Sequence, residues 1–192
     1  MGRWEGDARG RLEEAAMALY GERGFDNTTV ADIAKRAGLT ERTFFRHFAD
    51  KREVLFGGAH ELERFVARAV ADASAALAPI DAAAAGLESA ARLFEERRQF
   101  AQQRQVIIAA TAELREREAI KLSSLAAALA DALRRRGVND PAASLTAEIT
   151  VAVFKVSFER WVDETNQTTF VALIRDSLGQ MALLSTREPT TP

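Results

Sequence analysis

Cationic side chains are concentrated in a short stretch of the first third of the chain. Residues 33–52 contain two anions and six cations, a local charge of +4; the cations are Lys35, Arg36, Arg42, Arg46, Lys51 and Arg52. The whole chain carries −2, so the other residues must carry −6. Arginine and lysine bind phosphate oxygens, and arginine can present paired donors to guanine, so this distribution is typical of a DNA-reading segment on a separate body. The alternative is chance clustering of charge on a solvated face.

Groups that commonly carry catalysis or bind metals are scarce. The chain has no cysteine and two histidines, His47 and His60. His60 and Glu63 form a single His–carboxylate pair, whereas a carboxylate-bridged di-iron bundle needs two Glu-x-x-His pairs. A glycine-rich phosphate loop and a Gly-x-Ser-x-Gly elbow are also missing from the sequence. We therefore expect no enzyme, no catalytic residue, no metal site and no cofactor.

Hydropathy and the N-terminal sequence argue against a membrane or secreted protein. The apolar runs of the chain fall short of the ~18 residues that span a bilayer. The start of the chain is charged where a secretory signal would be apolar. We expect a cytoplasmic protein without a membrane partner.

Helical spacing of apolar residues extends over most of the chain, and alternating stretches are too short for a convincing strand. The sequence predicts an all-α fold of about nine helices, with an N-terminal three-helix helix-turn-helix head and a C-terminal helical bundle. A first helix ends at Gly24 and two short ones follow at residues 29–38 and 40–48. A long helix is expected from Asp50 to Pro79, followed by a linker turn or a short helix. The other helices are expected at residues 87–98, 101–111, 112–136, 141–163 and 167–185.

Two short helices joined by a glycine-containing turn can place side chains in the major groove of DNA. Thr29 and Asp32 have a capping-box-like spacing, and Thr40 is expected to cap the second helix. Phe44 and Phe48 lie one turn apart and are expected to anchor that helix in the core. The pattern leaves open whether Phe45 is also core. The residues that remain exposed for bases and phosphates are Glu41, Arg42, Thr43, Phe45, Arg46 and His47.

A spaced set of positions between Arg11 and Leu55 follows a known pattern. The set comprises Ala16, Leu19, Gly24-Phe25, Thr28-Thr29-Val30, Ile33-Ala34, Ala37-Gly38-Leu39-Thr40, Thr43, Phe45, His47-Phe48 and Lys51. On these residues the stretch resembles the DNA-binding domain of the TetR (tetracycline repressor) family of bacterial regulators. The resemblance implies a homodimer that reads double-stranded, near-palindromic operator DNA and is released from it by a small-molecule effector.

The resemblance also implies roles for individual residues. Thr40–Thr43 correspond to the first turn of the family's recognition helix, so Glu41 and Arg42 would read bases, with Arg46 next. Phosphate or backbone contacts are implied for Thr28, Thr29, Thr43, His47 and Lys51.

Two residues depart from the family pattern. Phe45 stands where a tyrosine is common, which removes a phosphate hydrogen bond. Arg42 stands where a glycine is common, which adds a long cation at the groove.

The C-terminal part is expected to dimerise. We place the domain boundary near Gly57–Gly58, with a DNA-binding domain at residues 1–56 and a ligand-binding and dimerisation domain at 57–192. The helix at 141–163 has two apolar stripes, one of Leu145, Ile149, Ala152 and Val156, the other of Val151, Phe154, Phe158 and Trp161. Two apolar faces suit a four-helix interface made by the last two helices of each subunit. The alternative is an ordinary internal core.

An effector cavity is implied by the resemblance alone. The candidate ligand-binding residues are Phe65, Phe94, Arg104, Ile107, Phe158 and Trp161, each with structural core as the alternative. We hypothesise that the effector favours one rotation of the long helix about Gly57–Gly58, which changes the spacing of the two heads. A different class of function is a helical dimer that binds proteins without operator binding. The cations at positions 42, 46 and 51 argue against it, because such a protein would not need them.

Overall fold

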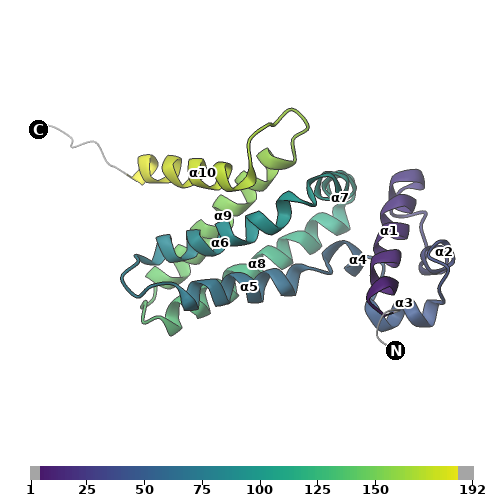
Figure 1. Ribbon diagram of the computed structural model, residues 1–192, viewed down its shortest axis with the longest axis horizontal. Coiled ribbons are helices and arrows are strands. Elements are labelled where there is room, and N and C mark those ends of the chain that lie inside the picture. The colour runs from purple at the N-terminus through teal and green to yellow at the C-terminus, as the bar shows by residue number, and fades with distance from the viewer. Residues whose placement is uncertain (1–4, 186–192) are drawn as a thin grey trace, which may run out of the picture. The chain divides into compact units, whose positions relative to one another are not determined.

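Ten helices follow one another through residues 5–185, the part of the chain that the computed structural model describes (Figure 1). They are α1 (Glu5–Arg23), α2 (Val30–Arg36), α3 (Glu41–His47), α4 (Glu53–Phe56), α5 (Ala59–Asp72), α6 (Pro79–Glu95), α7 (Arg98–Ala110), α8 (Ala112–Arg135), α9 (Ala142–Val162) and α10 (Phe170–Ser185). These residues contain no strand. The predicted all-α fold is confirmed. None of these ten helices is both long and apolar enough to cross a bilayer.

The chain divides into two compact units. The first, here called the head unit, contains the described residues up to Ala59 together with Phe100–Lys121. The second, the body unit, contains His60–Gln99 and the described residues from Leu122 onward. The predicted division between residues 56 and 57 stays a prediction, and its outer ends at residues 1–4 and 186–192 lie outside the described part.

The predicted signals at the ends of the first three helices are confirmed. Gly24 follows α1 with φ +85°, and Gly38 follows α2 with φ +65°. These left-handed conformations favour glycine, because a Cβ would clash with the backbone. Thr29 and Thr40 are the N-caps of α2 and α3.

The predicted long helix between Asp50 and Pro79 is wrong: two helices, α4 and α5, lie in its place. Gly57–Gly58 separates them, in keeping with the low helix propensity of glycine. The Asp50 carboxylate still accepts the backbone N–H groups of Arg52 and Glu53, 2.8 and 3.1 Å away, at the start of α4. Pro79 begins α6 instead of ending a helix, because its fixed φ suits a first helical position. Of the two alternatives for the segment that follows Pro79, a linker turn or a short helix, the structure has a helix, since residues 80–86 are part of α6.

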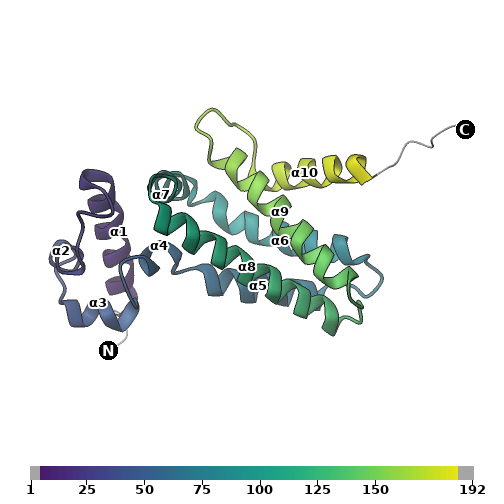
Figure 2. The same cartoon turned by 180° about the vertical axis from the view of Figure 1, so that it is seen from behind.

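The body unit is built around α6, which packs against both α9 and α10 (Figure 2). Its Gly86 lies close to α5, and a Cβ at this position would be 3.2 Å from Val66 Cγ1. Arg136 donates to the carbonyl oxygens of Val70, Ala73 and Ser74, and so satisfies the free acceptors at the end of α5.

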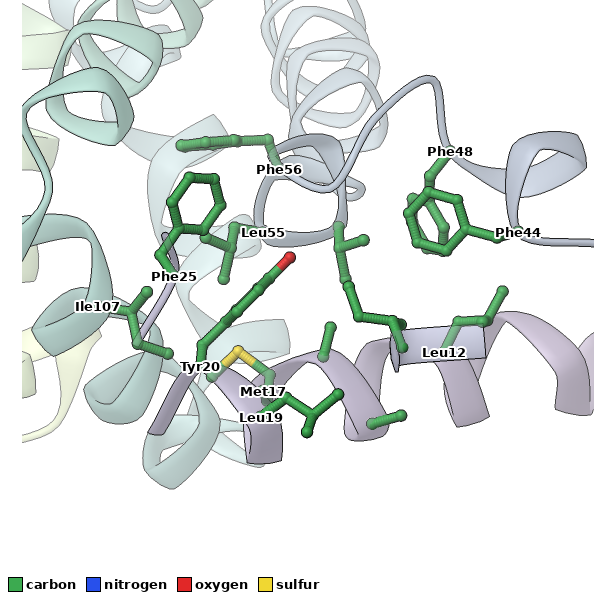
Figure 3. Packing of buried hydrophobic residues seen from close by; sticks show 14 of the residues in the cluster. Leu12, Met17, Leu19, Tyr20, Phe25, Phe44, Phe48, Leu55, Phe56 and Ile107 are labelled. Atoms are coloured by element: carbon green, nitrogen blue, oxygen red, sulfur yellow. The ribbon is translucent and has the colours of Figure 1, made fainter. Parts of the chain in front are cut away.

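The core of the head unit joins α1, α2, α3 and α4 to residues of α7 and α8. Figure 3 shows Phe44 and Phe48 near Leu12 of α1, while Tyr20, Phe25 and Ile107 lie together farther along the cluster. The buried Leu114 of α8 belongs to the same cluster. The three-helix head therefore has a core that it shares with residues from the middle of the chain.

Candidate nucleic-acid interface

The start of α2 is held by a reciprocal cap. The Thr29 hydroxyl accepts the Asp32 N–H at 3.1 Å and donates to the Asp32 carboxylate at 2.6 Å, and the carboxylate also accepts the Thr29 N–H. These bonds from Thr29, with a smaller contribution from Arg23, hold the pKa of Asp32 below its usual range. The predicted capping box is confirmed, with aspartate in the glutamate position. Thr29 is exposed, but its hydroxyl hydrogen is already used inside the cap.

The start of α3 presents two hydroxyl groups. Thr40 Oγ1 accepts the Thr43 N–H at 3.2 Å, and the two side-chain oxygens lie 3.0 Å apart. One hydroxyl donates to the other, so the second can donate elsewhere, for example to a phosphate.

One face of α3 is buried and the other is open. Phe44 is fully buried and Phe48 nearly so, which confirms both as core residues. Phe45 is 55% exposed, and its ring lies edge-on to that of Phe44 at a centroid distance of 5.5 Å. Glu41, Arg42 and Arg46 are exposed beside it. The open face of α3 thus combines an acid, two cations and an aromatic ring.

His47 is less accessible than its neighbours on α3. His47 as a whole is half-buried. Its ring atom Nε2 is buried without a hydrogen-bond partner among the described residues. A contact from Nε2 to a phosphate would require the side chain to turn outward.

Thr28 and Lys51 point into the head unit. Thr28 is buried, and its hydroxyl donates to the carbonyl oxygens of Gly24 at 2.9 Å and Leu19 at 3.4 Å. This burial turns the Thr28 side chain away from solvent, and the implied contact of Thr28 with DNA stays a prediction. Lys51 Nζ donates to the carbonyl oxygens of Phe25 and Thr28, both 2.9 Å away. The sequence could not indicate these acceptors, because every residue has a main-chain carbonyl whatever its type.

Ion pairs neutralise part of the cationic stretch. Arg36 forms a paired contact with Glu22, and Arg52 contacts Asp50 and Glu113. The bond from Arg36 holds the pKa of Glu22 below its usual range. Lys35 and Arg42 are exposed without an ion pair to any residue of the described range 5–185. The local charge of +4 therefore overstates the charge that can face a ligand.

The candidate ligand-binding residues fall into different units. Arg104 and Ile107 belong to the head unit, where Ile107 is a core residue. Arg104 donates to the Leu55 carbonyl at 2.7 Å and to Glu118 at 3.2 Å. These partners give Arg104 a structural role, and its contact with an effector stays a prediction.

The other candidates lie in the body unit. Phe94, Phe158 and Trp161 pack together in an aromatic cluster that also contains Phe154 and Phe170. Trp161 stacks on Phe170 at a centroid distance of 4.9 Å and is fully buried. Phe65 is 39% exposed on α5. Ligand binding by these residues also stays a prediction.

A short, glycine-terminated α2, a capped α3 with one open polar face, and a brace from α1 define a helix-turn-helix protein. Residues 12–56 match the family profile described as bacterial regulatory proteins, tetR family. Residues 77–184, more than half of the chain, match the profile of the MftR C-terminal domain. The chain belongs to the tetR family of bacterial regulatory proteins. Members of this family are DNA-binding transcription regulators rather than enzymes.

Sequence similarity to individual curated proteins covers a short part of the chain. The chain is 47% identical over 47 residues to the HTH-type transcriptional repressor KstR2 of Mycobacterium tuberculosis. The match covers 24% of the chain and 24% of KstR2, so the chain spans about a quarter of the length of this relative.

The fold of the whole chain is shared with solved structures. A complex of SmeT with triclosan covers 96% of this chain and 94% of its own, with a TM-score of 0.66 and 19% identity. FadR of Thermus thermophilus, a TetR-family repressor solved with lauroyl-CoA, covers 96% of this chain and 98% of its own, with a TM-score of 0.59 and 22% identity.

Proposed function

We propose that the chain is a sequence-specific transcriptional repressor that leaves a near-palindromic operator when a small-molecule effector binds. The observation that carries this proposal is the open face of α3, held by a buried Phe44 and presenting Glu41, Arg42 and Arg46. As a DNA-binding protein of a bacterial family, it would act in the cytoplasm.

Glu41 and Arg42 are proposed to read base edges, because they occupy the first turn of α3. Arginine can donate two hydrogen bonds to a guanine, and a glutamate can accept one from a cytosine amino group. Thr40 and Thr43 supply a hydroxyl for a phosphate, and Phe45 packs against sugar. Thr29 and His47 are secondary contacts, since the Thr29 hydroxyl hydrogen is used in the cap and His47 Nε2 is buried. Arg46 is also secondary, because it lies beyond the first turn of α3.

A homodimer through α9 and α10 is supported by the outer side of these helices. The α9 stripe that contains Val151, Phe154 and Trp161 is buried within the chain, whereas Leu145 and Val156 of the other stripe are 58% and 50% exposed. Leu183 and Leu184 near the end of α10 are 67% and 89% exposed. An exposed apolar face of this kind is typical of a protein–protein interface.

The effector is proposed to be a small molecule with a substantial apolar part. Two proteins of the same fold were solved with lauroyl-CoA and with triclosan, both of which contain apolar groups. Phe65, Phe94, Phe158 and Trp161 could meet such a molecule in the body unit. Ile107 and Arg104 are proposed as ligand contacts only if the head unit rearranges.

The connection between α4 and α5 is proposed as the lever between effector and DNA. Gly57 has helical dihedral angles, φ −58° and ψ −25°, and its carbonyl accepts Arg9 Nη2 at 2.7 Å. A Cβ at Gly57 would lie 2.6 Å from that nitrogen, so Gly57→Ala must displace Arg9. Operator titration of the Gly57→Ala/Gly58→Ala variant with effector tests this role. An effector response equal to that of the unchanged protein would contradict it.

The proposed function is tested by selecting bound sequences from a random DNA pool. A recovered palindrome supports both operator reading and the dimer. Arg42→Ala should then relax the preference at one base pair in each half-site, at a cost of about 1–3 kcal/mol. Failure to enrich any sequence would overturn the proposal and favour a dimer that binds other proteins.

A further inference from the structure

The ammonium group of Lys51 lies at the turn between α1 and α2, inside the head unit. Both Phe25 O and Thr28 O accept hydrogen bonds from Nζ at 2.9 Å, and Nζ lies 4.2 Å from the centre of the Phe25 ring. An ammonium has three N–H groups and no acceptor. Two of the three are used by main-chain oxygens, and the aromatic face adds a favourable cation–π contact.

We propose that Lys51 is a positioning residue for DNA binding, which fixes the turn at residues 25–28 and with it the start of α2, rather than a ligand of a DNA phosphate. The proposal rests on the proposed function, because it concerns how the head unit is held in the conformation that binds DNA.

The turn that Lys51 holds is short and closed by local bonds. Gly24 turns the chain with a positive φ, the Thr28 N–H donates to Phe25 O at 3.2 Å, and the Thr28 hydroxyl donates to Gly24 O. Phe25 O and Thr28 O remain as acceptors at the two ends of this turn. Lys51 bridges them, which keeps the ends of the turn at a fixed separation.

Lys51 is itself held from the opposite side. The hydroxyl of Tyr20, on α1, donates to the Lys51 carbonyl oxygen at 2.6 Å. Burial, followed by the charge of Asp50, raises the pKa of Tyr20, so this hydroxyl stays protonated and remains a donor. The side chain and the main chain of one residue thus connect the end of α1, the turn and the segment before α4.

The consequence for DNA binding follows from the next residue. Thr29 is bonded directly to Thr28 and caps α2, and α2 packs against α3. Loss of the Lys51 bonds takes this donor from Thr28 O, leaves Phe25 O with the Thr28 N–H alone, and frees the start of α2. The open face of α3 would then be presented in a wider range of orientations.

The test compares Lys51→Met with the unchanged chain by measuring affinity for one fixed DNA duplex over a range of salt concentrations. Each lost phosphate contact reduces the slope of log affinity against log salt by about 0.9. A positioning role predicts binding weakened about tenfold at constant slope, the expected scale for loss of a charged hydrogen bond. Lys35→Met, at an exposed lysine of α2, is the matched control for removal of a surface charge.

Backbone amide spectra of the DNA-free variants give a second readout. Lys51→Met should shift the amide signals of residues 25–29, and Lys35→Met should leave them in place. A salt slope reduced by about 0.9, the value of one phosphate contact, would overturn the proposal. An unchanged slope with unshifted amides would also overturn it.

A measurement on the unchanged protein covers the case in which Lys51→Met does not fold. The NMR signal of the Lys51 ammonium should be the same with and without the duplex, because its partners are internal. A large shift on adding DNA would indicate a phosphate contact and overturn the proposal. Non-specific DNA also binds through phosphates, so these tests can use a duplex of arbitrary sequence even if no operator is selected.

Discussion

Arg104 donates through Nε to the main-chain carbonyl oxygen of Leu55, 2.7 Å away, at the C-terminal end of α4. The same guanidinium donates to Glu118 and lies 4.9 Å from the centre of the Phe56 ring. Burial lowers the pKa of Arg104, and Glu118 opposes this effect. A partly buried cation is thus held by a carboxylate, a carbonyl and an aromatic face.

Arg104→Met should destabilise the protein by about 2 kcal/mol, because it leaves the partly buried Glu118 without its partner and the Leu55 carbonyl without its donor. Urea unfolding followed by circular dichroism measures the change. The matched control is Arg115→Met, at an exposed arginine that donates to Ala109 O, which should cost less than about 1 kcal/mol. Equal losses for the two variants would show that the Arg104 contacts do not stabilise the fold.

Phe44 and Phe45 are adjacent, but truncation of Phe44 should affect stability and truncation of Phe45 should affect DNA binding. Phe44→Ala removes a fully buried ring and should cost about 4 kcal/mol of stability. Phe45→Ala removes an exposed ring, so it should cost less than about 1 kcal/mol while weakening operator binding. Urea unfolding and fluorescence anisotropy with labelled DNA separate the two effects. A large loss of stability with Phe45→Ala would place this ring in the core instead.

Protonation of Asp50 should make the protein less stable in acid. Burial raises the pKa of its carboxyl, but the bonds from the Arg52 side chain and from the N–H groups of Glu53 and Arg52 lower it more. Because the folded-state pKa lies below the unfolded value of about 3.9, this contribution is complete above that value and is lost as the pH falls through the folded-state pKa.

Asp50→Asn should therefore lower stability at neutral pH by less than about 1 kcal/mol, since a partly exposed ion pair contributes little. The difference from the unchanged protein should shrink as the pH falls below about 3.9. Urea unfolding at a series of pH values measures it. A difference that stays constant into strong acid would mean that the Asp50 charge has no part in it.

Leu145→Glu and Val156→Glu should each weaken the proposed dimer by at least about 2 kcal/mol, because they place a charge on the exposed apolar face of α9. Sedimentation equilibrium measures the dissociation constant. Leu93→Glu is the matched control, since Leu93 is 62% exposed on α6, outside the proposed interface. If the dimer persists in both α9 variants, the interface lies elsewhere.

Features that depend on neighbouring residues could be predicted from the sequence. The caps at Thr29 and Thr40 and the turns at Gly24 and Gly38 agree with the prediction because each is decided within one helical turn. Pro79 shows the limit of such signals. A proline can follow one helix or begin the next, and the sequence around it does not distinguish the two.

Roles that depend on distant main-chain atoms could not be predicted. Lys51 and Arg104 are long cations that would suit a phosphate or an effector, yet both donate to carbonyl oxygens far away in the sequence. Main-chain oxygens occur at every position, so no pattern of residue types marks the few that accept such a bond. The exposure of Phe45 was likewise decided by packing rather than by helical spacing.

The contribution of Ile107, Ile108 and Leu114 to the head core affects how the protein is made. A ribosome adds about 5–20 residues per second, so α1, α2 and α3 leave it several seconds before α7 and the start of α8. During that interval part of the apolar surface that these residues cover stays open to solvent or to chaperones. A fragment that stops at residue 56 would remain in that state permanently, with a higher tendency to aggregate than the full chain.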